Sequence, residues 1–327
     1  MNSLTRRRFL KATSTASLAL TLPLSAQAKM SKLTKPVSIG MITDLHQDIM
    51  HDGPKRLAKF LAAMKVQQPD AIVQLGDFAV PDPKNQTLID TFNAAHPNAY
   101  HVLGNHDTDG GYTTDQVLAS WSMPTPYYTT EVAGLRLIVL DGNEPPANHK
   151  NGYPAHIGTK QADWLRAELK SDDRPVIIFS HQPLAGPWCI DNAMEVQQIL
   201  TEFSDRVLLA LNGHTHIDLL SRVGNVGYLH VNSASYVWVN SNYKHQSYSD
   251  EIHAAFPKIA SACPYREALF TTLTFDPGKN QVLIAPCETQ WVGPSPAQLG
   301  RDKHPELTDG EEIAPRIRSR KLIRIKE

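Results

Sequence analysis

The pattern of apolar and polar residues in the first third of the chain alternates between short apolar runs and longer stretches with helical spacing. Nearly continuous apolar runs cover residues 36–43, 71–75 and 99–103, which is typical of strands that are covered on both faces of a sheet. Residues 54–66 place apolar side chains at helical spacing, and a further helical stretch precedes the third run. This alternation predicts βαβ units.

The alternation continues to His216 and then changes. Residues 159–169 have the pattern of an amphipathic helix, and residues 176–179 and 207–211 predict two more buried strands. After His216 the strand-like runs are shorter and turn-rich segments separate them; they cover residues 219–223, 228–231, 269–275 and 282–285. We expect these runs to be antiparallel strands of a second sheet.

The sequence shows no internal repeat and no clear linker, so it predicts one domain over residues 36–290. A polar extension follows at residues 294–327 and ends in a basic alternation from Arg316 to Lys326. For this extension we favour a solvated tail or an added edge strand over a binding arm.

The first 28 residues have the features of an export signal. Paired arginines at Arg6 and Arg7 precede a modestly apolar stretch, which ends in the small-residue pattern Ala26-Gln27-Ala28. The apolar stretch is interrupted by Thr, Ser and Pro and is shorter than a bilayer span, so it does not predict a stable membrane anchor. We expect a twin-arginine signal peptide, cleaved after Ala28, and a periplasmic or secreted protein that the twin-arginine machinery exports.

Composition narrows the class of protein only a little. Removing the signal peptide takes away four of the 32 basic residues and none of the 33 acidic ones, which leaves a formal charge of −5. A mildly acidic surface argues against binding nucleic acid. The three cysteines lack metal-type spacing and permit one disulfide at most.

Five short segments place metal-binding residue types directly after predicted strands. They are Asp44-Leu45-His46, Gly76-Asp77, Gly104-Asn105-His106-Asp107, Ser180-His181 and Gly213-His214-Thr215-His216. One such segment is weak support for a site, but together they supply enough oxygen and imidazole ligands for two adjacent divalent ions. Alternate residues of an extended segment point the same way, so Asp44 and His46 can hold one ion. The Cα atoms of His214 and His216 would lie about 7 Å apart, which suits two neighbouring ions better than one.

The ordered set of segments resembles the calcineurin-like metallophosphoesterase superfamily. The resemblance implies a four-layer αββα sandwich, in which helices flank two mixed β-sheets. It also implies which residues hold each ion. The first ion would be held by Asp44, His46, Asp77 and His216. The second would be held by Asp77, Asn105, His181 and His214, with Asp77 as the bridge. Mn, Fe and Zn all accept such ligands.

The same resemblance implies a role for His106, as the general acid that protonates the leaving oxygen. In related branches a residue three positions after the bridging aspartate is an aspartate that supports this histidine, or a metal-binding tyrosine. Here that position is Val80. We therefore expect another carboxylate, Asp107 or Asp48, to support His106.

Other polar residues near the motifs are candidates for substrate binding. His149, Trp188 and Asn192 lie in segments that adjoin the motifs. The remaining histidines are interpreted as solvated or structural.

The sequence thus predicts a periplasmic phosphoesterase with two metal ions, which hydrolyses small phosphomonoesters or phosphodiesters through attack of a metal-bound hydroxide. A cyclic-nucleotide phosphodiesterase is an alternative within the same class. A metal-binding or recognition module on the same fold, without turnover, is an alternative from another class.

Overall fold

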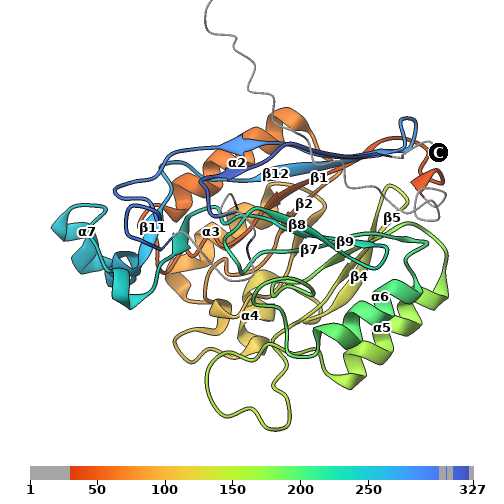
Figure 1. Cartoon of the computed structure of the whole chain (residues 1–327), viewed down its shortest axis with the longest axis horizontal. Helices are drawn as coiled ribbons and strands as arrows, with labels where there is room; N and C mark the ends of the chain where they lie inside the picture. The colour runs from red at the N-terminus through yellow and green to blue at the C-terminus, as the bar shows by residue number, and fades with distance from the viewer. Residues whose placement is uncertain (1–29, 302–306, 308–311, 324–327) are drawn as a thin grey trace, which may run out of the picture.

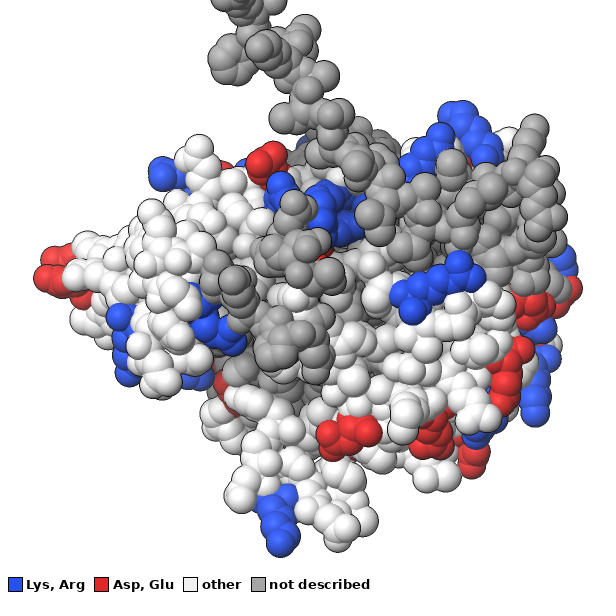
Figure 2. All heavy atoms as spheres, viewed as in Figure 1, with Lys and Arg blue, Asp and Glu red and all other residues white. Residues whose placement is uncertain are grey.

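The computed structural model describes residues 30–301, 307 and 312–323. The predicted signal peptide at residues 1–28 lies outside this range. Within the described residues, no helix is both long enough and apolar enough to cross a membrane. Acidic and basic side chains are interspersed on the face shown in Figure 2.

Two six-stranded mixed sheets form the centre of the molecule (Figure 1). The order of the first sheet is β16-β13-β12-β1-β2-β3. Its strands are β1 (Val37–Ile42), β2 (Ala71–Gln74), β3 (Ala99–His101), β12 (Thr271–Asp276), β13 (Gln281–Ile284) and β16 (Arg320–Ile323).

The order of the second sheet is β4-β5-β6-β7-β9-β8. Its strands are β4 (Tyr128–Val132), β5 (Leu135–Val139), β6 (Val176–Phe179), β7 (Val207–Asn212), β8 (Leu219–Val223) and β9 (Val226–His230). Two short pairs lie outside both sheets: β10 (Tyr236–Trp238) with β11 (Ala262–Pro264), and β14 (Cys287–Glu288) with β15 (Arg316–Ile317).

The helices cover the outer faces of the sheets and complete the predicted four layers. Side chains of α2 (Gly53–Gln67), α3 (Gln86–Ala94) and α4 (Thr114–Trp121) share one apolar cluster with strands of the first sheet. Side chains of α5 (Thr159–Ser171) and α6 (Ala193–Glu202) share another with the second sheet. Away from these layers, α7 (Asp250–Ala255) projects at one end (Figure 1). The short 3₁₀ helices are η1 (Pro83–Asn85), η2 (His106–Thr108), η3 (Ser241–Tyr243) and η4 (Pro257–Ser261).

The two-residue repeat of the strands explains how one apolar run serves two interfaces. In β6, Ile177 and Phe179 face the core between the two sheets, whereas Val176 and Ile178 face α5 and α6. Successive side chains of a strand point to opposite faces, so a strand that is buried on both faces must be apolar throughout. The βαβ interpretation of the first third of the chain is confirmed, because β1, β2 and β3 are parallel neighbours.

The prediction for the later strands was wrong in one respect. We expected residues beyond His216 to build a second sheet of their own, but they divide between the two sheets. β12 pairs antiparallel with β1 in the first sheet, and β9 pairs parallel with β7 in the second. Local alternation predicts a strand but contains no information about its neighbour, which is decided by packing of side chains far apart in sequence.

The end of the chain belongs to the fold. β16 pairs with β13 as the edge strand of the first sheet, so the edge-strand interpretation is confirmed and the folded unit extends past residue 290. Two basic residues of this segment meet a buried carboxylate. Arg318 Nε and Arg320 Nη1 lie 2.8 and 2.5 Å from the oxygens of Asp218.

Candidate metal centre

The carboxyl ends of five strands in two sheets bring the motif residues together. Asp44 and His46 follow β1, Asp77 follows β2, and Asn105 lies just beyond β3. His181 follows β6 in the second sheet, and His214 and His216 lie just beyond β7; all seven predicted ligands therefore extend from the carboxyl ends of parallel strands. Ligand sites in open α/β sheets form in this position.

Two clusters of candidate ligand atoms lie side by side. The first contains Asp44, His46 and His216, and the second contains Asp77, His181 and His214. In the first, Nε2 of His216 lies 3.2 Å from both Nε2 of His46 and Oδ1 of Asp44. The clusters therefore separate His214 from His216, which is the division that two ions require.

Asp77 lies between the clusters. Its Oδ2 is 3.1 Å from Nε2 of His181 in the second cluster and 3.5 Å from Nε2 of His46 in the first. Its Oδ1 accepts a hydrogen bond from the backbone N–H of His106. This is the position that a bridging carboxylate would occupy.

Hydrogen bonds on the far side of two imidazoles fix which nitrogen faces the centre. Nδ1 of His181 lies 2.7 Å from the carbonyl oxygen of Leu75, and Nδ1 of His216 lies 2.6 Å from that of Tyr236. Because a carbonyl only accepts, each Nδ1 carries the hydrogen and donates it. In the neutral ring Nε2 then offers its lone pair to the centre, as metal-binding histidines do.

Two buried polar atoms of the site lack a hydrogen bond of good geometry. Oδ1 of Asn105 makes no hydrogen bond, and Nε2 of His181 makes none either, although Oδ2 of Asp77 lies 3.1 Å from it. Burying a polar atom without a partner costs about 1–3 kcal/mol. Both atoms belong to the predicted ligands of the second ion, so the residues present fit a dinuclear centre.

The backbone of the site is held in an uncommon conformation. Asp44, His46, Asp77, His214 and His216 have φ between 50° and 64°, and they make up five of the eleven non-glycine residues with positive φ in the described chain. Such conformations cost about 1–3 kcal/mol each and collect at functional sites. The extended geometry that we assumed for Asp44 and His46 is therefore wrong. A left-handed turn at each residue, and not strand alternation, directs these side chains to the centre.

Close packing of the ligand loops requires glycine at two positions. A Cβ on Gly76, whose φ is +96°, would lie 2.4 Å from the ring of His181, and one on Gly104 would lie 2.2 Å from the backbone nitrogen of Asp77. The backbone of Gly76 therefore lies directly against His181, and that of Gly104 lies directly against Asp77. No larger residue fits at either position.

The electrostatics of the site keep the carboxylate of Asp77 ionised. Burial opposes ionisation of Asp77, but the nearby His181 and His46 outweigh it and hold the pKa of Asp77 well below its usual range. Burial lowers the pKa of His46, and it lowers that of His214 to about 3. For His181, burial is outweighed by Asp77, which raises the pKa of this histidine to about 9. Because a proton and a metal ion compete for the same nitrogen, metal binding at His181 would release a proton.

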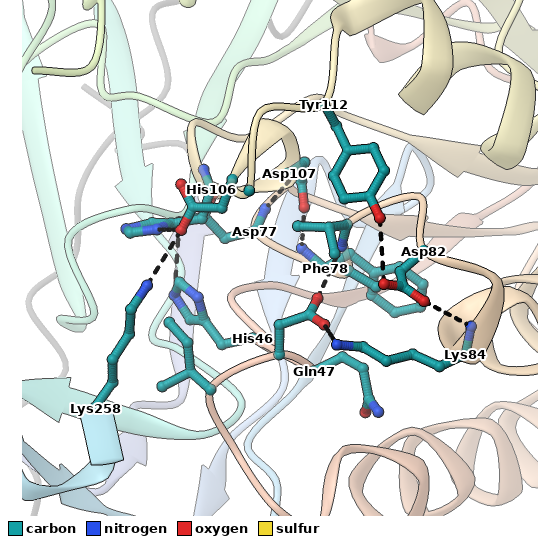
Figure 3. A pocket seen from close by; sticks show the side chains of 16 residues that line it. His46, Gln47, Asp77, Phe78, Asp82, Lys84, His106, Asp107, Tyr112 and Lys258 are labelled. Atoms are coloured by element: carbon teal, nitrogen blue, oxygen red, sulfur yellow. Dashed lines mark hydrogen bonds and ion pairs between the residues drawn. The ribbon is translucent and has the colours of Figure 1, made fainter. Parts of the chain in front are cut away.

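The residue that supports His106 is Asp109. Nδ1 of His106 lies 2.9 Å from Oδ2 of Asp109, and the hydroxyl of Tyr153 donates to Oδ1 of Asp109 at 2.6 Å. Lys258 approaches the same carboxylate at 3.4 Å, and its side chain points toward the site in Figure 3. Burial opposes the charge on His106, but Asp109 prevails and raises the pKa of His106. Burial likewise opposes ionisation of Asp109, whose hydrogen bonds from His106 and Tyr153 lower its pKa to about 2.

The two carboxylates expected beside His106 have other roles. Asp107 accepts hydrogen bonds from the backbone N–H groups of Asp77, Phe78 and Gly104, so it ties the loop after β2 to the loop after β3. Asp48 accepts from the backbone N–H of Val80 and from Asn85. That prediction was wrong, because spacing along the chain does not show that η2 turns Asp109 back toward the histidine one turn earlier.

A cleft extends from the centre in two directions. A polar lobe of about 360 Å³ shares Asp77 and His106 with an aromatic lobe of about 310 Å³. The polar lobe is also lined by Gln47, Asp48, Asp82, Lys84, Asp109, Tyr112 and Lys258 (Figure 3). The aromatic lobe is also lined by Asn105, Tyr153, Trp188, His214, Ile217, Val237, Trp238, Val239, Arg301 and Ile313.

Of the three predicted substrate residues, only Trp188 lines the cleft. Asn192 makes two hydrogen bonds with the backbone of Ile157 and holds the loop before α5. Nε2 of His149 lies 3.1 Å from the carbonyl oxygen of Gly152 on an exposed loop outside both lobes. Sequence reasoning missed Asp109, Tyr153, Trp238 and Lys258, which carry no motif. The one available signal was the spacing of Asp109, three residues after His106.

Two buried histidines away from the site, His101 and His230, have structural roles. Nε2 and Nδ1 of His101 contact Asn93 and Gln74, and Nε2 of His230 contacts the carbonyl oxygen of Ala185. No disulfide joins the three cysteines, Cys189, Cys263 and Cys287.

Comparison with known proteins places this geometry in a family. Residues 37–218, more than half of the chain, match the family model described as Calcineurin-like phosphoesterase. A cAMP/cGMP dual specificity phosphodiesterase from Mycobacterium tuberculosis is 29% identical over 183 residues, which cover 50% of this chain and 55% of that protein. The chain thus spans about half the length of this curated relative.

Solved structures share the fold at low sequence identity. A dimetal phosphatase from Danio rerio superposes with a TM-score of 0.55 at 15% identity, over 78% of this chain and 98% of that one. GAP50, the anchor in the inner membrane complex of Plasmodium, gives 0.53 at 15% identity over 90% of each chain. At this identity the likeness shows the fold alone.

Proposed function

Because the chain belongs to the calcineurin-like phosphoesterase family, we propose that it hydrolyses small phosphomonoesters or phosphodiesters with two divalent transition-metal ions. The observation that carries this proposal is the pair of ligand clusters that meet at Oδ2 of Asp77. A cleft opens at the same residue, so a substrate would reach both ions.

The charges of the site suit a phosphate ester. Two divalent ions bring a charge of +4, and Asp44 and Asp77 return −2, so the loaded site keeps about +2 and attracts phosphate oxygens. When bound, the ions supply positive charge that polarises the phosphoryl group and acidifies water as the nucleophile. Asp77, whose Oδ2 lies near His181 of one cluster and His46 of the other, would offer a ligand to both ions. Asn105, in the loop after β3, would add a neutral oxygen ligand without reducing the positive charge.

His106 is the proton donor in this proposal. Asp109 accepts from Nδ1 of His106, so the ring stays protonated and its Nε2 carries the proton for the leaving oxygen. Tyr153 and Lys258 hold Asp109 in place from other parts of the chain. The four residues therefore act as one proton-donating unit beside the metals.

We propose that the enzyme acts in the periplasm or outside the cell. The paired arginines Arg6 and Arg7 and the pattern Ala26-Gln27-Ala28 support export by the twin-arginine route. Proteins cross by that route already folded, so metals could be bound before export. The acidic mature chain supports a small-molecule substrate over nucleic acid.

Two other functions have some support. The name of the mycobacterial relative favours a cyclic-nucleotide phosphodiesterase, although export away from cytoplasmic cyclic nucleotides counts against a signalling role. A binding module without turnover would use the same fold, but a site that had lost turnover should also have lost some of its ligands or His106.

Metal content and turnover of one ester test the proposal together. Protein purified without chelator should contain about two transition-metal ions per chain, and it should hydrolyse a chromogenic phosphate ester with Mn²⁺ but not after chelation. Asp77→Asn should lose metal and activity together. The matched control is Asp163→Asn, which changes an exposed carboxylate on α5. One ion per chain, unchanged by Asp77→Asn, would contradict the two-metal site, and two ions without turnover of any ester would favour the binding module.

A further inference from the structure

The two lobes of the cleft differ in the side chains that line them. This difference indicates which kind of group is attached to the phosphate of the substrate. Most side chains that line the polar lobe are charged or polar, among them Asp48, Lys84 and Lys258, and they are accompanied by the apolar Ile49, Phe78, Ala79 and Val80. Aromatic and aliphatic side chains line the aromatic lobe, among them Tyr153 and Trp188. Both lobes share Asp77 and His106, so each lobe offers space for a substituent of a phosphate at the metals.

Large aromatic surface is exposed in the aromatic lobe. In the described chain only four large hydrophobic residues are exposed, and two of them line this lobe: Tyr153 at 48% and Trp188 at 43%. The other two, Val66 and Met194, lie outside both lobes. Leaving aromatic rings in contact with water has a cost that a bound apolar group removes.

The backbone holds Trp188 in an uncommon conformation. Its φ is 55°, a value that a bulky residue rarely adopts. Of the other ten described non-glycine residues with positive φ, five are candidate metal ligands. A strained aromatic residue in the same cleft as those ligands is typical of a residue placed to bind.

A third aromatic ring of this lobe, that of Trp238, lies close to two histidines of the site. The ring of Trp238 is centred 6.4 Å from that of His106 and is inclined to it by only 29°. It is centred 6.1 Å from the ring of His46. A group attached to the oxygen that His106 protonates would therefore lie against Trp238, with Trp188 in the same lobe.

We propose that the aromatic lobe binds the planar base of a nucleoside whose phosphate ester lies at the metal centre. This inference rests on the proposed hydrolysis and adds its substrate class. A planar heteroaromatic ring stacks on Trp and Tyr, and Arg301, which also lines the lobe, adds a guanidinium plane on which a base can stack. At about 310 Å³ the lobe is at the lower end of ligand pockets, which suits one base.

The test compares two esters that share a leaving alcohol. Adenosine 5′-monophosphate and methyl riboside 5-phosphate both release a primary 5′-hydroxyl, so their chemical reactivity is matched and only the base differs. The methyl diester of each is assayed as well. We expect kcat/KM to be about 5- to 150-fold higher for the base-bearing ester, the factor that one stacked base contributes.

Variants of Trp188 test whether the aromatic lobe causes the preference for the base-bearing ester. In Trp188→Ala the ratio of the two rates should fall toward one, whereas Trp188→Phe should keep most of it. Met194→Ala, an exposed position outside both lobes, should leave the ratio unchanged. Because the ratio compares two substrates on one preparation, it does not depend on how much of a variant is folded.

A binding measurement adds a readout without turnover. Adenosine, which has no ester, should quench tryptophan fluorescence of the wild-type protein, and Trp188→Ala should bind it at least fivefold more weakly.

Equal rates for the two esters, or no turnover of either while p-nitrophenyl phosphate is hydrolysed, would overturn the inference and leave the proposed function standing. A preference that Trp188→Ala does not change would overturn the assignment to this lobe. No turnover of any ester, p-nitrophenyl phosphate included, would overturn the proposed function itself.

Discussion

At the scale of single residues, the candidate metal ligands and the proposed proton donor make different contacts. Asp77 and His181 lie within the ligand clusters, whereas His106 contributes only its backbone N–H to Asp77 and directs its ring to Asp109. Substitutions in the ligand clusters should therefore reduce metal content, whereas substitutions of His106 should reduce the rate and leave the metal content unchanged.

His106→Ala should keep both metals and lose about 10²- to 10⁴-fold in rate on an alkyl ester, the usual range for loss of a general acid. An ester of an acidic phenol needs little protonation and should be much less affected. Metal analysis and kinetics with the two leaving groups measure this. Equal losses for both esters would assign His106 to charge stabilisation, and loss of a metal would make it a ligand.

Asp109→Asn should shift the pH dependence of alkyl-ester hydrolysis. Asp109 raises the pKa of His106, so in the wild-type protein the acid form survives to higher pH and is lost as the pH rises through that pKa. Without the carboxylate the pKa falls, and the alkaline limb of the kcat profile should move to lower pH.

Tyr153→Phe is the graded control for this prediction, because it removes one hydrogen bond to Asp109 and leaves the carboxylate in place. It should shift the limb less than Asp109→Asn. If Asp109→Asn leaves the profile where it is, Asp109 does not support the proton donor.

At the scale of elements, one buried carboxylate, that of Asp218, binds the segment that forms the last strand, β16. Asp218 is fully buried and accepts from the backbone N–H and Nε of Arg318 and from Nη1 of Arg320. The pairing ties the loop after β7, which carries His214 and His216, to the edge strand β16.

Asp218→Ala should destabilise the protein by about 3–5 kcal/mol, because it leaves the mostly buried guanidinium of Arg320 without its carboxylate. Denaturant unfolding measures the loss. Asp163→Ala removes a carboxylate that lies 3.7 Å from Arg166 on the surface of α5 and should change stability by less than about 1 kcal/mol. A loss at Asp218 as small as the loss at Asp163 would show that the strand is held by its ladder alone.

At the scale of the whole molecule, the centre exists because two sheets present their carboxyl ends to the same cleft. The first sheet supplies Asp44, His46, Asp77 and Asn105, and the second supplies His181, His214 and His216. The apolar core between the sheets holds the two halves in register. Neither half contains the complete predicted ligand set for either ion.

The proposed export also concerns the whole chain. Replacing Arg6 and Arg7 with Lys should keep the protein in the cytoplasm, because the paired arginines are read by a receptor and do not act as general positive charge. Cell fractionation with an antibody to the mature protein reports the outcome. An unchanged periplasmic yield would indicate the general secretory route.

Sequence alone determined the parts of this protein that depend on local pattern. The apolar runs predicted β1, β2 and β6 within a residue or two, because a strand covered on both faces must be apolar throughout. The motif residues after those strands predicted where ligands would gather, because parallel strands end at one edge of a sheet.

The tertiary structure decided what depends on distant contacts. It placed β12 beside β1 and β16 at the sheet edge, since strand partners are chosen by packing across the core. It selected Asp109 over Asp107 and Asp48, since a single turn of η2 redirects that carboxylate. It also assembled the aromatic lobe from Tyr153, Trp188 and Trp238, which lie on separate segments and share no motif. Their common surface exists only where folding brings those segments to the metal centre.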